Sequence, residues 1–418
     1  MIELRSKKQE TRTWNWKWRV FINASVICSL LLLASMADAQ AVDPNIPPYT
    51  SNGHKITPGA ERLHGLLALL HDKKVALMVN QTSTVGETPL VDTLLAYGIN
   101  IKKIFAPEHG FRGKADAGES LNDSIDAKTG LPVISVYGKK KKPTADDLAD
   151  VDIVVFDIQD VGARFYTFIS SLHYLMEACA ENNKKLIVLD RPNPNGWYVE
   201  GPVLKKEFQS FVGLDPVPVV YGLTIGEYAQ MINGEKWLPD GMQCTLMIIP
   251  CQNYDHTDQF SLPIKPSPNL PNAAAIALYP YLCFFEGTNV SVGRGIDLPF
   301  QVIGSPKTKF DGAYEFTPQS KPGAKEPPFL KQKCYGYALS PSNQKSSFHY
   351  VLQMYKLCAD RDDFFLKNNF FDKLAGTGEI RKMIIAGKTE DEIKASYSKD
   401  LEAFKLIRKK YLLYKDFE

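Results

Sequence analysis

The stretch IKKIFAPEHGFRG, residues 101–113, is the most informative part of this 418-residue chain for its fold class. Its first part, residues 101–105, predicts a short buried strand. A proline and two glycines then fix a loop that carries a carboxylate, an imidazole and a guanidinium, from Glu108, His109 and Arg112. Proteins of the α/β class place their chemistry in polar loops that follow a strand. The stretch therefore predicts an enzyme of that class.

The same pattern recurs on both sides of this stretch. Continuous apolar runs are typical of parallel strands that are buried on both faces. Helical patterns over 90–97 and 165–181 separate the runs, and alternating strands and helices indicate a parallel sheet with right-handed crossovers. The four predicted strands are 75–79, 101–105, 151–156 and 186–189.

Polar side chains follow each predicted strand. The carboxyl ends of parallel strands share one edge of the sheet, so we expect these side chains to form one site. The alternative for any single Asp or Asn after a strand is a helix N-cap. The polar residues that follow the four predicted strands are Asn80, Gln81, Glu108, His109, Asp157, Asp160, Asp190 and Arg191.

The N-terminus has the features of an export signal. A basic region ends at Arg19, an apolar region spans 21–34, and Ala37-Asp38-Ala39 supplies the small residues of an A-x-A cleavage site. This pattern predicts a signal peptide at 1–39, cleaved near Ala39, and a periplasmic or secreted protein. An uncleaved anchor is the alternative, but the apolar run is too short for a stable membrane span.

Net charge and length indicate what kind of protein the remainder of the chain forms. Removing the first 39 residues, with six basic and three acidic side chains, changes the net charge from +2 to −1, so no nucleic-acid partner is expected. Two domains, 55–265 and 266–418, are predicted after a linker at 40–54. An amphipathic helix is expected over 391–414.

Seven cysteines occur in the chain, and one of them, Cys28, lies in the predicted signal peptide. The other six are too sparse for a disulfide scaffold. The sequence has no C-x-x-C motif, so no structural zinc is expected.

Common catalytic signatures are absent from the sequence. It has no G-x-S-x-G, H-E-x-x-H, Walker or G-x-G-x-x-G motif, so neither a cofactor nor a metal is expected. Carboxylates, arginines, tyrosines and amides remain. These groups suit glycoside hydrolysis, in which one carboxyl protonates the leaving oxygen and a second stabilises or attacks the sugar carbon, or activates water.

Several ordered blocks resemble one known family, the exo-acting β-N-acetylmuramidases (NamZ-like). The blocks include residues 79–82 (VNQT), 105–113 (FAPEHGFRG), 129–133 (TGLPV), 156–167 (FDIQDVGARFYT), 189–194 (LDRPNP), 200–202 (EGP), 266–269 (PSPN), 285–289 (FEGTN) and 410–414 (KYLLY). The resemblance implies a Rossmann-like catalytic domain with a smaller C-terminal auxiliary α/β domain. It also implies removal of terminal N-acetylmuramic acid from the non-reducing end of peptidoglycan fragments during cell-wall turnover, with peptidoglycan-derived saccharides as partners.

Catalytic roles follow from the residue chemistry. Glu108 is the candidate general acid, and the alternative is a structural pair with Arg112. Asp160 or Asp157 is the candidate second carboxylate, with Glu286 and Asp126 in reserve, and His109 orients Glu108 or binds a hydroxyl. The substrate's own acetamido group is an alternative nucleophile.

Substrate-binding roles are predicted for a wider set. An arginine is expected to grip the lactyl carboxylate of N-acetylmuramic acid, because a guanidinium binds a carboxylate bidentately. Tyr166, and in second place Tyr137, are expected to stack or hydrogen-bond at the sugar. The predicted set is Asn80, Gln81, Arg112, Arg164, Tyr166, Asp190, Arg191, Glu286, Asn289 and Arg294.

The sequence departs from the family pattern beside Arg294. Val292 stands where the family usually carries Glu, and Ile296 stands where it carries Thr. Two other functions are compatible with these residue types. A metal-dependent hydrolase would use His109, Asp157 and Asp160 and would lose activity in chelator. A non-catalytic murein-binding protein would bind sugar without turnover.

Overall fold

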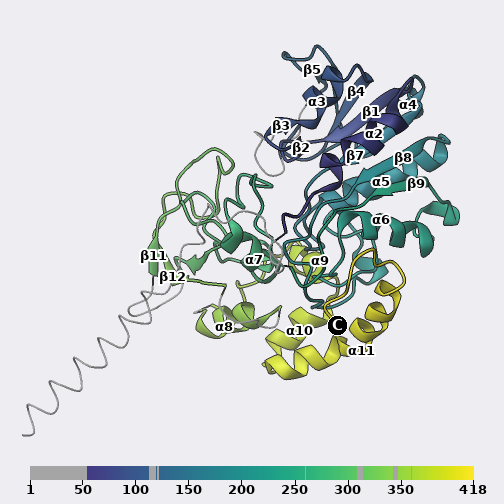
Figure 1. Ribbon diagram of the computed structural model, residues 1–418. Coiled ribbons are helices and arrows are strands. Elements are labelled where there is room, and N and C mark those ends of the chain that lie inside the picture. The colour runs from purple at the N-terminus through teal and green to yellow at the C-terminus, as the bar shows by residue number, and fades with distance from the viewer. Residues whose placement is uncertain are drawn as a thin grey trace, which may run out of the picture. The chain divides into compact units, whose positions relative to one another are not determined.

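The computed structural model describes residues 54–112, 119, 122–258, 260–307, 314–341, 347–358 and 360–418 (Figure 1). The predicted signal peptide, nearly all of the linker, and Gly113 lie outside the described residues. Residues from 54 onward belong to one compact unit. In the described part of the chain, no helix is long and apolar enough to cross a membrane. The domain boundary at 265/266 stays a prediction.

A seven-stranded sheet forms the N-terminal half, with strand order β5-β6-β4-β1-β7-β8-β9. All neighbours pair in parallel except the edge pair β5 and β6, which is antiparallel. This arrangement confirms the α/β class and the four predicted strands. The strands are β1 (Lys74–Val79), β4 (Asn100–Ala106), β5 (Ser124–Ile125), β6 (Pro132–Ser135), β7 (Ile153–Asp157), β8 (Lys185–Leu189) and β9 (Thr245–Ile249).

Successive side chains of the central strand β1 enter two different cores. Val75 and Leu77 pack in the cluster that includes helices α2 (Leu63–Leu70) and α3 (Leu90–Ala96). Ala76 and Met78 pack in the cluster that includes α5 (Phe168–Glu181) and α6 (Ile225–Gly234). The period-2 alternation of a strand thus explains why an unbroken apolar run is needed here.

The strand order reverses direction at β1. The chain passes from β1 to β4 and β6 on one side, and then returns to β7, β8 and β9 on the other side. Such a reversal opens a crevice at the carboxyl ends of the strands, and ligands of open α/β sheets bind there. The loops that follow β4 and β7 flank this point. These loops carry Glu108 and the segment 158–167.

The C-terminal half adds a small antiparallel sheet and helices. Its core is continuous with the α5 side of the large sheet, since Leu278, Val351 and Leu374 belong to the same cluster as Phe156. The sheet order is β10-β12-β11. The elements are α7 (Ala273–Leu282), β10 (Val302–Ser305), β11 (Tyr314–Phe316), β12 (Cys334–Ala338), α8 (His349–Leu357), α9 (Phe370–Ala375), α10 (Glu379–Ile385) and α11 (Glu390–Arg408).

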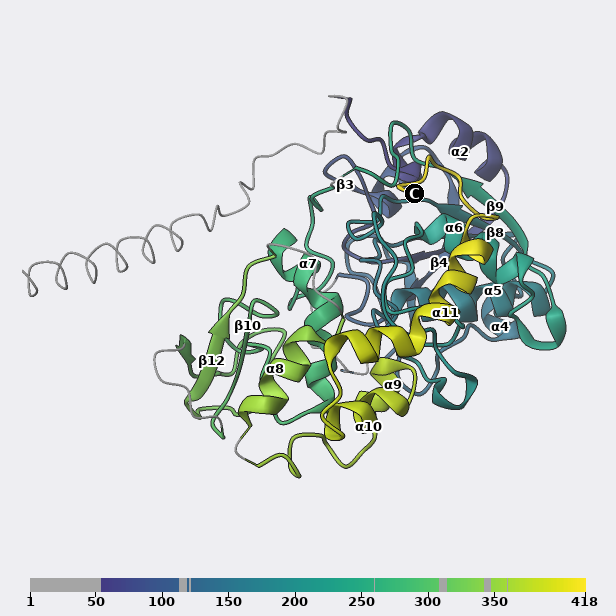
Figure 2. The ribbon, with the colours of Figure 1, turned by 90° about the horizontal axis from the view of Figure 1, so that it is seen from below.

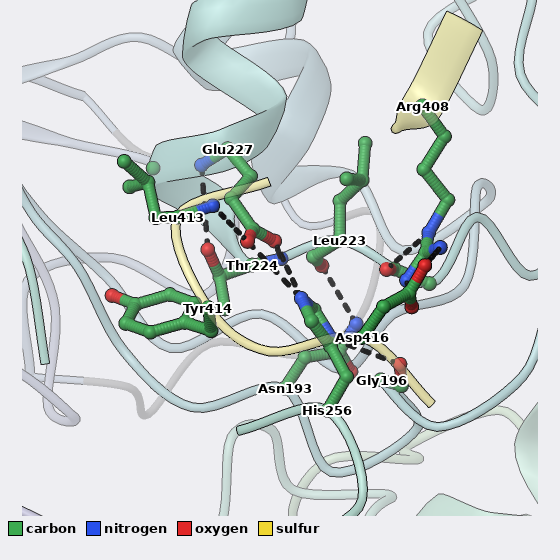
Figure 3. Close-up of polar contacts among 12 residues, drawn as sticks. Asn193, Gly196, Leu223, Thr224, Glu227, His256, Arg408, Leu413, Tyr414 and Asp416 are labelled. Atoms are coloured by element: carbon green, nitrogen blue, oxygen red, sulfur yellow. Dashed lines mark hydrogen bonds and ion pairs between the residues drawn. The ribbon is translucent and has the colours of Figure 1, made fainter. Parts of the chain in front are cut away.

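The last helix is shorter than the predicted span of 391–414. α11 ends at Arg408, and the chain then runs back to α6 and β8 as a non-helical tail (Figures 2 and 3). Leu413 donates its N–H to Oε1 of Glu227 at 2.8 Å, and the Tyr414 hydroxyl donates to Oδ2 of Asp190 at 2.5 Å. The Arg408 guanidinium holds Asp416 at 2.8–2.9 Å. These long-range bonds explain why the helical pattern did not extend to the tail.

Candidate active site

A cavity of about 340 Å³ lies beside the loops that follow β4, β6 and β7. Segments from both halves of the chain line it, so residues far apart in sequence meet there. The lining residues are Glu108, His109, Tyr137, Phe165, Tyr166, Thr167, Phe211, Val212, Ser267, Asn269, Leu270, Tyr279, Glu286, Arg294, Phe300 and Phe370.

Two hydroxyl groups fix the orientation of Glu108 in this cavity. Tyr137 donates to Oε1 at 2.9 Å, and Thr167 donates to Oε2 at 2.6 Å. Burial raises the pKa of Tyr137, and the charge and hydrogen bond of Glu108 raise it further. Tyr137 therefore stays a neutral hydrogen-bond donor. Thr167 is the N-cap of α5 and makes no side-chain cap bond, because its hydroxyl serves Glu108 instead.

The backbone turns sharply directly after Glu108. His109 has a φ of 68°, in the left-handed region that non-glycine residues rarely adopt, and it is buried beside the cavity. Strained residues of this kind concentrate at functional sites. The structure therefore brings His109 and Glu108 together, as the sequence predicted, at the end of one strand.

A second carboxylate in the cavity comes from the C-terminal half. Arg294 binds Oε1 of Glu286 through Nε at 2.7 Å and Nη2 at 2.6 Å. Burial lowers the pKa of Arg294, but the charge and hydrogen bond of Glu286, with smaller contributions from Tyr279 and Cys283, together raise the pKa overall, so the guanidinium stays charged. Arg294 also faces the Phe300 ring, 5.2 Å from its centroid. Glu286, a reserve candidate from the sequence, thus shares the cavity with Glu108.

Asp157, at the end of β7, and Asp160, in the loop that follows, are both buried, and neither is among the residues that line the cavity. Arg191 binds both oxygens of Asp157, at 2.6 and 2.9 Å, and neither side chain lines the cavity. Asp160 accepts hydrogen bonds from the Tyr221 hydroxyl and from the Gly162 N–H. Burial raises the pKa of Asp160 to about 7, and these hydrogen bonds offset part of the rise.

Two of the predicted lactyl-binding arginines are engaged elsewhere. Arg112 binds both oxygens of Asp126 at 2.9 Å, and neither residue lines the cavity with Glu108. Arg164 is fully buried and donates to three backbone carbonyls, those of Pro202, Val217 and Leu374. Burial lowers the pKa of Arg164 to about 9. Through Leu374 this side chain ties the large sheet to the C-terminal half.

The remaining predicted binding residues hold loops together. The Asn80 side chain accepts two hydrogen bonds from Thr82, and Gln81 donates to the Pro266 carbonyl at 2.9 Å. Asp190 accepts from Thr224, Gly226 and Tyr414. The Asn289 amide donates to the Asp363 carbonyl. None of these four predicted residues is among the described lining residues.

Several lining residues were not predicted individually. Thr167, Ser267 and Asn269 fall within blocks that carry the family resemblance, but the sequence assigns no role to any of them. Their signal was membership of those blocks, because their residue types alone fit any loop. Val292, which the sequence marked as a departure from the family pattern, is 3% exposed and packs in the main core rather than at the cavity. Across the described ranges, no cluster of three or more His, Cys, Asp or Glu is arranged to hold a metal ion.

Comparison with known proteins assigns this chain to a family. Residues 75–274 match the family described as "Exo-beta-N-acetylmuramidase NamZ, N-terminal", and residues 277–414 match its C-terminal counterpart. The chain is a glycoside hydrolase and belongs to the exo-β-N-acetylmuramidase family.

Three relatives illustrate the similarity. The chain is 38% identical over 408 residues to the peptidoglycan beta-N-acetylmuramidase NamZ of Bacillus subtilis (strain 168), covering 92% of this chain and 97% of the relative. The chain is also similar to a DUF1343 family protein from Bacteroides fragilis NCTC 9343 whose crystal structure is known. The two sequences are 46% identical, the TM-score is 0.79, and the match covers 87% of this chain and 100% of that protein's chain. A second such protein from the same organism is 31% identical, with a TM-score of 0.73, and covers 86% and 99%.

Proposed function

We propose that this enzyme releases terminal N-acetylmuramic acid from the non-reducing end of peptidoglycan fragments. The observation that carries the proposal is the placement of Glu108 and Glu286 in one cavity of a chain that belongs to the exo-β-N-acetylmuramidase family. Most glycosidases use a pair of carboxyl groups as their catalytic residues. The volume of about 340 Å³ is at the small end of ligand pockets, roughly 300–1,000 Å³, and suits a terminal sugar better than a long glycan.

Glu108 is the proposed proton donor. Its carboxyl group is held by Tyr137 and Thr167 on both oxygens, so its orientation toward a bound sugar is fixed before the substrate arrives. Such preorganisation lets a proton pass to the glycosidic oxygen as the bond to the sugar carbon breaks. Glu286 is the proposed second carboxylate, which stabilises the positive charge that develops on the sugar ring or activates water.

A hydrolysis assay tests this function directly. The purified protein is expected to release the chromophore from a chromogenic N-acetylmuramide and to remove single N-acetylmuramic acid residues from the non-reducing end of peptidoglycan fragments, detected by mass spectrometry. Fragments whose terminal sugar is N-acetylglucosamine serve as the control and should be cleaved far more slowly. Release of internal fragments, or equal action on both kinds of end, would contradict the exo-acting assignment.

We also propose that the chain is exported. The support is the sequence pattern of basic region, apolar region and Ala37-Asp38-Ala39. Export would place the enzyme in the periplasm or outside the cell, where peptidoglycan fragments occur. Mass spectrometry of the protein from a periplasmic or medium fraction should give a mature N-terminus near Gln40. A full-length chain found only in the cytoplasm would contradict export.

A further inference from the structure

Arg294 is the only Lys or Arg side chain among the described residues that line the cavity with Glu108. The other three arginines predicted from the sequence have their guanidinium groups committed outside it. Arg112 binds Asp126, Arg191 binds Asp157, and Arg164 binds backbone carbonyls. A negatively charged substituent of a sugar in this cavity therefore has one permanent cation to meet.

Glu286 contacts only one edge of the Arg294 guanidinium. Nε and Nη2, which form one edge of the group, both bind a single oxygen of Glu286. No hydrogen bond joins Nη1 to any described residue, and the side chain is 18% exposed. An arginine fork binds a carboxylate with two parallel N–H groups. The edge formed by Nη1 and Nη2 is thus left for a ligand.

The local backbone is built to present this side chain. Arg294 lies between Gly293 and Gly295, whose φ angles are 79° and 85°. A Cβ at position 295 would lie 2.4 Å from the Gln319 carbonyl oxygen, so a larger residue does not fit there. Glu286 and the Phe300 ring then hold the guanidinium from two sides. The rigid mounting reduces the entropy that Arg294 loses when a ligand binds.

We infer that Arg294 is the specificity-determining residue that binds the lactyl carboxylate of N-acetylmuramic acid, with Glu286 anchoring the adjacent edge of its guanidinium. The inference rests on the proposed function, because it names the receptor for one substituent of the proposed substrate. The lactyl group is what distinguishes this sugar from N-acetylglucosamine. Arg294 therefore favours N-acetylmuramic acid over N-acetylglucosamine, and Glu108 acts on the glycosidic bond of whichever sugar is bound.

The test compares two chromogenic substrates, an N-acetylmuramide and the N-acetylglucosaminide that lacks the lactyl group. In Arg294→Gln, kcat/KM on the muramide should fall by about 10- to 150-fold, the range for a hydrogen bond to a charged group. Because Arg294 also holds Glu286, part of the loss should fall on both substrates. The diagnostic quantity is therefore the ratio of kcat/KM on the muramide to kcat/KM on the glucosaminide, which should fall in Arg294→Gln. Arg294→Lys should recover part of the activity on the muramide. The matched control is Arg381→Gln, since Arg381 binds Asp372 side-on but does not line the cavity. Its selectivity should stay that of the wild type.

Two further readouts keep the inference testable if the variant folds poorly or no sugar is released. A muramide whose lactyl carboxylate is converted to an amide should be a poorer substrate for the wild type by a similar factor. Calorimetry with free N-acetylmuramic acid should show tighter binding to the wild type than to Arg294→Gln. Equal losses on both sugars, no penalty for the amide, or equal affinities would overturn the assignment. Failure of the wild type to hydrolyse any muramide, with the affinity difference intact, would instead overturn the proposed function.

Discussion

Glu108→Gln is expected to lower kcat/KM on a chromogenic N-acetylmuramide by on the order of 10³-fold, about 4 kcal/mol of transition-state stabilisation. The substitution keeps the size of the side chain and an oxygen that can still accept a hydrogen bond, so Tyr137 and Thr167 lose little packing. What it removes is the ability to give and take a proton. Thermal unfolding should change little, and binding of free N-acetylmuramic acid should persist.

A double-mutant cycle separates catalysis from structure at this position. Tyr137→Phe and Thr167→Val remove the two hydroxyl donors while keeping ring and shape, and each should lower kcat by roughly tenfold. Because both groups act through Glu108, neither should lower the residual rate further in the Glu108→Gln background. Thr167→Ser keeps the hydroxyl and should retain most of the activity. Equal rates for wild type and Glu108→Gln would refute the assignment of Glu108 as proton donor.

Much of the N-terminal fold was predictable because parallel strands leave a strong local signal. Residues 75–79 must be apolar on both faces, since alternate side chains enter two separate cores. A polar interruption would therefore cost burial on one side or the other. The pattern consequently identified β1, β4, β7 and β8. It also predicted that their carboxyl ends meet, which the parallel pairing confirms.

The tail after α11 was not predictable in the same way. Residues 409–414 carry helical propensity, but their position depends on Glu227 and Asp190, which lie about 180 residues or more away in the chain. β6 and β9 also went unpredicted. β6 has only four residues. The apolar run of β9, residues 246–249, is as long as that of β8, but β9 is an edge strand whose side chains are only partly buried.

The sequence indicates which polar residues lie at the edge of the sheet, but it does not indicate which of them line the cavity. Asp157 and Glu108 both follow an apolar strand, and both lie near arginines in the sequence. The structure separates them, because Asp157 faces Arg191 in the interior while Glu108 lines the cavity. Glu286 and Arg294 reach the same cavity from a segment about 180 residues further along the chain. No local pattern encodes that meeting, which depends on how the two halves pack.

Arg191→Met is expected to lower the free energy of unfolding by about 3–5 kcal/mol, because it leaves Asp157 as a buried charge without its partner. Asp157 is fully buried and Arg191 is 6% exposed. The methionine fills part of the space but provides no donor for either carboxylate oxygen. Thermal and urea unfolding measure the loss. The matched control is Arg112→Met, which breaks a similar bidentate pair whose arginine is 37% exposed, and should cost no more than about 1 kcal/mol.

The effect of Arg191→Met should also depend on pH. Burial raises the pKa of Asp157, and the charge of Arg191 offsets part of that rise. Without Arg191 the folded-state pKa rises further above the unfolded value. A carboxyl of this kind favours the folded state when protonated, and that contribution is lost as the pH rises through the folded pKa. The deficit relative to wild type should thus be smaller at pH 5 than at pH 8. The double variant Asp157→Asn/Arg191→Met, which has no charge to bury, should lack this dependence and regain part of the stability. A deficit that is the same at both pH values would mean that Arg191 stabilises the fold by packing alone.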